Sequence, residues 1–246
     1  MSNIRLVLMY DGAGYFGFAE QKEVPTVSGE LKRSLKKLLG EEIPIIGASR
    51  TDRGVHALGQ VVSFKSGSRL SANDYKGALN FLLPSDIRVL KAEEVGEEFH
   101  ARFSARGKEY CYSIFEGRDL PFNLRNFSLH VRGGLDAAAM RKAADYLLGE
   151  HDFTSFAQEI IGSPIRRIDA IDIVEKNDPM GRVLEFRFRG NSFLYKMIRA
   201  IMGTLIEAGR GKKGPDEINE ILKARDRKRA GATASPHGLC LIRVIY

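Results

Sequence analysis

The apolar patterns of this chain follow one order of strands and helices, and that order occurs twice. The first half predicts strands at 4–10, 43–48, 60–65 and 87–93, and helices at 26–40 and 71–84. Thr26 is a helix cap followed by apolar residues at helical spacing, and Ser71 with Asp74 forms a capping box for the second helix. The order β-α-β-β-α-β is that of a ferredoxin-like, split β-α-β unit.

The second half repeats this order without visible sequence repetition. It predicts strands near 108–115, 166–175, 182–189 and 239–246, helices at 135–148 and 192–208, and a short helix after Pro215-Asp216. We therefore expect an α+β fold of two ferredoxin-like subdomains, with antiparallel sheets joined side by side, helices packed on the sheet and a central cleft. The boundary is expected near Phe99, which gives an N-terminal subdomain at 1–99 and a C-terminal one at 100–246.

The charge balance favours an anionic partner, nucleic acid first. The 246 residues include 38 Lys and Arg against 31 Asp and Glu, which leaves a net charge of +7. The two cysteines form no Cys-x-x-Cys motif, and the five histidines show no i, i+4 pair, so no metal site is indicated. No run approaches the ~18 apolar residues of a membrane span. We expect a cytoplasmic protein.

A polar loop at Ser49–Ala57 places one carboxylate, Asp52, between Arg50 and Arg53. Nearby positive charge keeps a carboxylate ionised, and the same guanidinium groups bind phosphates. Gly54 permits close backbone approach, and His56 adds a donor. A single ionised carboxylate suits nucleophilic or base chemistry. The alternative is a turn carboxylate satisfied by backbone amides or by a nearby arginine.

A glycine-rich segment, Gly12-Ala13-Gly14-Tyr15-Phe16-Gly17, follows the first strand and matches G-x-G-x-x-G. This pattern indicates dinucleotide binding only where a helix opens at the glycines. Residues 18–25 show no helical period, so a loop that turns the chain and approaches a partner is the preferred interpretation. A nicotinamide-dependent dehydrogenase remains the weaker competitor.

Two further candidates lie in the second half. Tyr110 shares an alternating strand face with Tyr112, so one of the two could be a core aromatic. Arg199 falls beside the apolar stripe of the helix at 192–208, where it is either a surface charge or a group that reaches a carboxylate in an interdomain cleft. Lys196 precedes it and is a candidate for RNA binding.

Together these motifs resemble the TruA family of tRNA pseudouridine synthases. The loop at Ser49–Gln60 is similar to the family signature, and the resemblance spans the chain in order. It includes Tyr10-Asp11-Gly12, Thr26-Val27, Phe99-His100-Ala101-Arg102-Phe103-Ser104-Ala105, Tyr110-Cys111-Tyr112, Asp152 to Phe156, Phe193 to Gly203 and Gly238-Leu239.

The resemblance implies residue roles. It implies that Asp52 is the catalytic aspartate, that Tyr110 packs on the target base and that Arg199 forms a salt bridge with the aspartate. It further implies that Arg50 helps to flip the base, and we place Arg53, His56 and Lys196 with it as RNA-binding candidates.

The resemblance also implies a substrate and an assembly. It implies a homodimer without cofactor or metal that acts on uridines 38 to 40 of the tRNA anticodon stem-loop. Many bacterial members carry Gly and Ala where this chain has Ser49 and Arg53, and Trp where it has Phe18, so archaeal or eukaryotic relatives are expected. The alternatives are the same isomerase acting at other tRNA positions, and a non-catalytic tRNA-binding module in which Asp52 is a structural turn residue.

Overall fold

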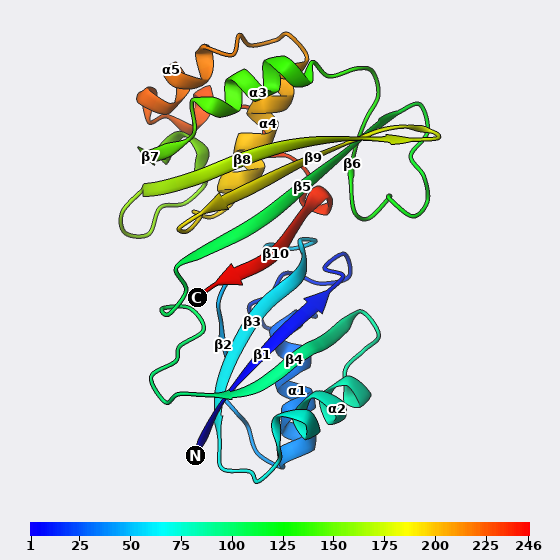
Figure 1. The fold of residues 1–246 in the computed structure, drawn as a ribbon, viewed down its shortest axis with the longest axis vertical. Helices are drawn as coiled ribbons and strands as arrows, with labels where there is room; N and C mark the ends of the chain where they lie inside the picture. Colours follow the sequence, from blue (N-terminus) through cyan, green and yellow to red (C-terminus); the bar gives the residue numbers. More distant parts are fainter. The chain divides into compact units, whose positions relative to one another are not determined.

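The computed structural model describes residues 1–246 as two compact α+β units (Figure 1). The first unit combines Met1–Arg106 with Cys240–Tyr246, and the second is Gly107–Leu239. The expected division at 1–99 and 100–246 differs from this one because the last strand, β10 (Leu239–Ile245), pairs in parallel with β3 (His56–Ser66) of the first unit. None of the helices has both the length and the apolar character needed to cross a membrane.

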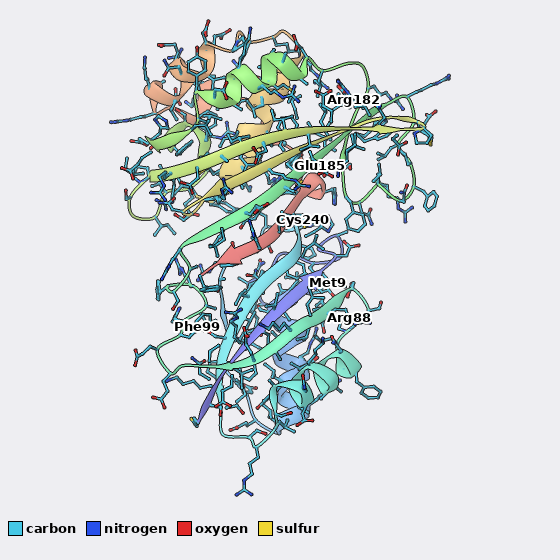
Figure 2. All side chains as sticks on the ribbon, viewed as in Figure 1. Met9, Arg88, Phe99, Arg182, Glu185 and Cys240 are labelled. Carbon is cyan, nitrogen blue, oxygen red and sulfur yellow. The ribbon has the colours of Figure 1, made fainter.

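The sheet of the first unit has the strand order of a ferredoxin-like fold. Besides β3, its strands are β1 (Ser2–Tyr10), β2 (Ile46–Gly47) and β4 (Ile87–Val95). The order is β4-β1-β3, and β2 pairs with β3 antiparallel at Ile46↔Ser63. The strand expected at 43–48 is therefore shorter than predicted. Figure 2 labels Met9 and Arg88, which lie opposite each other on β1 and β4.

Local signals define the two helices of this unit, α1 (Val27–Leu39) and α2 (Ala72–Leu82). Thr26 accepts a hydrogen bond from Gly29 N, and Gly40 ends α1 with a left-handed φ of 79°. The predicted capping box of α2 is present. The core is formed by fully buried side chains from one face of the sheet and from the helices, such as Leu6, Leu8, Leu31 and Leu35.

The second unit has the antiparallel strand order β5-β9-β8-β7, with β6 pairing in parallel with β5. Its strands are β5 (Gly107–Gly117), β6 (Leu129–Val131), β7 (Gly149–Asp152), β8 (Ile165–Asp178) and β9 (Gly181–Gly190). Its helices are α3 (Ala137–Asp145), α4 (Met197–Gly209) and α5 (Glu217–Ala224), with 3-10 turns at Thr154–Phe156, Arg227–Arg229 and Pro236–Gly238.

Helix α4 begins later than its apolar pattern suggests. The pattern predicts a helix from 192, but Lys196 has a left-handed φ of 59° and only the following residues continue as a helix. The predicted stripe is confirmed, since Ile198, Ile201 and Leu205 are buried. The turn at Lys196 therefore separates the segment at 191–195 from the helix that carries Arg199.

Candidate active-site loop

Asp52 lies on the turn that connects β2 to β3. Val55 N donates to Asp52 O at 3.1 Å and closes the turn. Gly54 adopts a φ of 76°, which only glycine adopts freely, and its amide donates to Tyr15 O at 3.2 Å. Asp52 is half-buried while its neighbours Thr51 and Val55 are buried. The turn therefore holds its backbone inside the protein and leaves the carboxylate partly accessible.

A buried polar network fixes the start of this loop. The Gln60 side chain, which has no exposed surface, accepts from Ser49 N at 3.1 Å and donates to Ser49 O at 2.7 Å. The Tyr10 and Thr51 hydroxyls are 2.7 Å apart and share a hydrogen bond. Hydrogen-bonded buried groups resist displacement because an unpaired buried polar atom is unfavourable. These contacts hold the residues on either side of Arg50 in place.

The glycine-rich segment packs directly on the loop. A Cβ atom added at Gly12 would lie 2.0 Å from Val55 O, and one at Gly17 would lie 2.7 Å from Thr51 O. Phe18 N donates to Thr51 O at 3.0 Å. No helix opens at these glycines, because α1 begins only at Val27. The dinucleotide-binding interpretation is therefore wrong, and the segment is a brace for the Asp52 loop.

The cations of the loop have separate surroundings. Arg50 and Arg53 are both exposed, and the Arg53 guanidinium lies 4.0 Å from the centre of the Phe16 ring. The His56 ring is buried, and its Nδ1 accepts from Gly12 N at 3.1 Å and lies 3.1 Å from Asp11 Oδ1. The expected contact of His56 with RNA does not fit this burial. His56 instead connects the glycine-rich segment to β3.

The two tyrosines of β5 differ in their surroundings. Tyr112 is fully buried and donates to Ser235 O at 2.8 Å, and burial raises the pKa of its hydroxyl. Tyr110 is also buried, with 7% of its surface exposed, and its ring meets the Phe193 ring edge-on at a centroid distance of 5.4 Å. Tyr112 is thus the core aromatic, and Tyr110 remains the candidate for substrate contact.

Arg199 is held by the segment at 232–234, which contacts α4. Its Nε donates to Ala234 O at 2.8 Å, and Ala234 N donates to Arg199 O at 3.0 Å. The segment lies close to the helix because Gly203 has no side chain, as an added Cβ would lie 1.7 Å from Ala232 O. Lys196 Nζ lies 5.0 Å from the centre of the exposed Tyr195 ring. Both cations therefore have defined positions within the second unit.

The predicted site residues divide between the two units. Arg50, Asp52, Arg53 and His56 belong to the first unit, and Tyr110, Lys196 and Arg199 to the second. Three residues that hold the loop are not predicted from the sequence: Tyr10, Phe16 and Gln60. A polar Gln60 within an apolar run is the one sequence signal for them. The structure contains no group of three or more His, Cys, Asp or Glu side chains arranged to hold a metal ion.

Most of the basic face of α1 is paired with acids. Its ion pairs are Lys32 with Glu20, Arg33 with Glu30 and Lys36 with Glu42. Exposed pairs of this kind are ordinary features of a solvated helix. The positive charge of α1 is therefore partly neutralised, and Arg50 is the better candidate for phosphate contact.

Comparison with known proteins gives matches over the full chain. The sequence profile of the family described as tRNA pseudouridine synthase matches residues 6–104 and 143–246. Among curated proteins, "tRNA pseudouridine synthase A" of Ruminiclostridium cellulolyticum is 44% identical over 248 residues, and that of Moorella thermoacetica is also 44% identical over 248 residues. "tRNA pseudouridine synthase A 2" of Clostridium perfringens is 41% identical. In each case the alignment covers 100% of both chains.

These three relatives come from bacteria. They give no support to the archaeal or eukaryotic resemblance expected from Ser49 and Arg53. The contact of Arg53 with Phe16 offers a structural reason for an arginine at this position that does not depend on the kind of organism.

Proposed function

The chain belongs to the tRNA pseudouridine synthase family, and from this premise we propose that Asp52 is the catalytic group of its reaction. A tRNA pseudouridine synthase is an isomerase. It breaks the N1–C1′ bond of a uridine, turns the uracil and joins C5 to C1′; C5 loses a proton and N1 gains one. Atoms and electrons balance within the nucleotide, so the reaction needs no external oxidant or reductant.

The observation that supports this assignment is that a fixed turn holds a partly accessible Asp52 side chain. The carboxylate is partly accessible, while the residues around it are fixed by Gln60, Tyr10 and the glycine-rich segment. Such preorganisation is what a group that must meet one sugar carbon requires. The carboxylate either attacks C1′ or removes the proton from C2′.

Arg50 acts on the substrate before the chemical step. A uridine within a stem must leave its stack, which costs on the order of a few kcal/mol. We assign Arg50 to the space that the flipped base leaves and to the neighbouring phosphates. Its exposure beside a fixed backbone supports this role, because it can reach RNA without moving the catalytic turn. Arg53 contributes positive charge from its position on Phe16, and Lys196 contributes positive charge from the second unit.

Tyr110 and Arg199 receive the roles that the family resemblance implies. Tyr110 packs on the uracil ring, for which its edge-on contact with Phe193 provides a fixed orientation. For Arg199 we propose the salt bridge with Asp52 that the resemblance implies. The hydrogen bond from Arg199 to Ala234 supports this role, since it restricts the guanidinium.

The target uridines, the assembly and the compartment are also proposals. We propose that the enzyme modifies uridines 38 to 40 of the anticodon stem-loop, works as a homodimer in the cytoplasm and uses no cofactor. The competing possibility is a tRNA-binding module in which Asp52 serves only the turn.

The test is incubation of the purified protein with unmodified tRNA transcripts, followed by mapping of pseudouridine through chemical adducts that stop reverse transcription. Transcripts with cytidine at position 38, 39 or 40 serve as matched substrates. The proposal expects product at these positions in the parent transcript and loss of one signal in each variant. Tight tRNA binding without any pseudouridine would favour the binding module, and product elsewhere would correct the target.

A further inference from the structure

An exposed aromatic side chain stands on the connection between β4 and β5, outside the Asp52 loop. Phe103 is 76% exposed, and it belongs to the segment that begins at Phe99 (Figure 2). A single exposed apolar ring is common on protein surfaces, so exposure alone assigns Phe103 no role. Its immediate neighbours show what it could bind.

The segment around Phe103 is rigid. His100 Nδ1 accepts hydrogen bonds from the amides of Arg102 and Phe103, both at 3.2 Å. His100 N donates to Ser104 Oγ at 3.1 Å, and Ser104 N donates to His100 O at 2.9 Å. These bonds define a tight turn with a fixed imidazole. The exposed Phe103 side chain is therefore attached to a backbone that these hydrogen bonds fix.

The turn is also anchored to the sheet. Ala101 is fully buried, its amide donates to Ser63 Oγ at 3.1 Å, and its carbonyl accepts from the Tyr246 hydroxyl at 2.7 Å. Ser63 lies on β3, the strand that follows the Asp52 loop. The exposed ring is thus attached to the same rigid scaffold as the catalytic turn.

Phe103 contacts an aromatic ring and a cation. The His100 and Phe103 rings are stacked, with a centroid distance of 4.3 Å and an interplanar angle of 28°. The exposed Arg102 guanidinium lies 5.5 Å from the centre of the Phe103 ring. Other exposed phenylalanines, Phe81 at 88% and Phe122 at 86%, have no ring or guanidinium contact. Phe103 is therefore distinguished by its surroundings and not by exposure alone.

We propose that Phe103, supported by His100 and Arg102, is a stacking platform for an unpaired nucleobase of the tRNA substrate, in addition to the base that undergoes reaction. This inference rests on the proposed function, because it takes tRNA as the ligand. Unpaired RNA bases stack on aromatic rings and arginine planes, and a cation beside the ring attracts the adjoining phosphates. A second copy of the chain fits less well, because an apolar contact on Phe103 would also bury the charge of Arg102.

The experiment measures equilibrium binding of an unmodified tRNA transcript and the kinetics of pseudouridine formation. Phe103→Ala is expected to raise Kd and KM by roughly 5- to 100-fold, because one base loses its stacking partner. At saturating tRNA its kcat stays unchanged, since Phe103 does not contact the reacting atoms. Phe103→Tyr keeps an aromatic face and restores binding, whereas Phe103→Leu keeps apolar area without an aromatic face and behaves like alanine.

Two controls make the result specific. Phe81→Ala removes an even more exposed ring, from α2, and should bind tRNA as the parent protein does. Arg102→Gln should reduce the slope of log affinity against log salt concentration by about the value expected for one phosphate contact. The platform is refuted if Phe103→Ala binds tRNA normally, if the leucine variant restores binding, or if the alanine variant acts only by changing the oligomeric mass.

The measurements distinguish failure of the Phe103 platform from failure of the enzymatic assignment. If no variant and not even the parent protein forms pseudouridine, the enzymatic assignment fails, yet the comparison of tRNA affinities still decides the platform. If all proteins form pseudouridine and Phe103→Ala shows unchanged KM, the platform fails and the enzymatic assignment stands.

Discussion

The packing of Gly12 on the Asp52 loop gives a quantitative prediction for Gly12→Ala. The added Cβ would lie 2.0 Å from Val55 O, and ordinary contact begins at 3.4 Å. The two segments would have to separate by about 1.4 Å, because the obstacle is backbone and cannot rotate away. Val55 closes the turn that carries Asp52. The substitution therefore displaces the carboxylate itself.

The expected size of the effect follows from this displacement. A shift of about 1 Å at a catalytic group lowers the rate on the order of 100-fold, so kcat should fall by at least that factor. Overpacking costs about 1–3 kcal/mol of stability, which corresponds to a decrease in Tm of about 2 to 12 °C for a chain of this size. Affinity for tRNA should fall less than kcat, because Arg50 and Arg53 move with the loop but keep their exposure and charge.

Single-turnover pseudouridine formation, tRNA binding and thermal melting are the measurements. Gly14→Ala is the matched control, since a Cβ at Gly14 meets nothing within 4 Å and Gly14 lies in the same glycine-rich segment. The control should keep the parent rate and Tm. A Gly12→Ala enzyme with normal turnover, or a Gly14→Ala enzyme that loses as much as Gly12→Ala, would refute the assignment of this segment as a brace.

Three further predictions concern the second unit. Tyr110→Phe should retain most activity and Tyr110→Ala should lose roughly 5- to 100-fold in kcat/KM, because stacking needs the ring; equal losses would identify the hydroxyl as the essential group. Arg199→Ala should lower kcat with little effect on tRNA affinity, and an unchanged rate would leave Arg199 with only its structural bond to Ala234. Burial raises the pKa of the Cys111 thiol to about 11, so about one thiol in a thousand is ionised at pH 8. Alkylation of Cys111 at pH 8, followed by mass spectrometry, should be slow in the folded protein and fast after unfolding; equal rates would show that the thiol is accessible.

The helices could be predicted closely because their ends carry local signals. Thr26 and Gly40 define α1, and the Ser71 capping box starts α2. Strands β6 and β7 were not predictable, since three or four residues are too few to show alternation. The unit that β10 joins depends on its pairing with β3, far away in the sequence, and no local pattern encodes that pairing.

The candidate site shows the same limit. Charge and spacing were sufficient to single out Asp52 between two arginines. The burial of His56 and the contact of Arg53 with Phe16 depend on how the glycine-rich segment folds over the loop. Sequence alone presents all of these side chains as available to a ligand. The structure leaves Arg50 and Arg53 exposed, with Arg53 against the Phe16 ring, and buries His56.

The most direct test of the account is pseudouridine formation by Asp52→Asn, which keeps the shape of the side chain and removes its charge. The account predicts no detectable product on unmodified tRNA, with tRNA affinity and Tm close to those of the parent protein. Asp74→Asn, which changes an exposed carboxylate on α2, should leave product formation intact. Normal pseudouridine formation by Asp52→Asn would contradict the central claim that this carboxylate carries out the isomerisation.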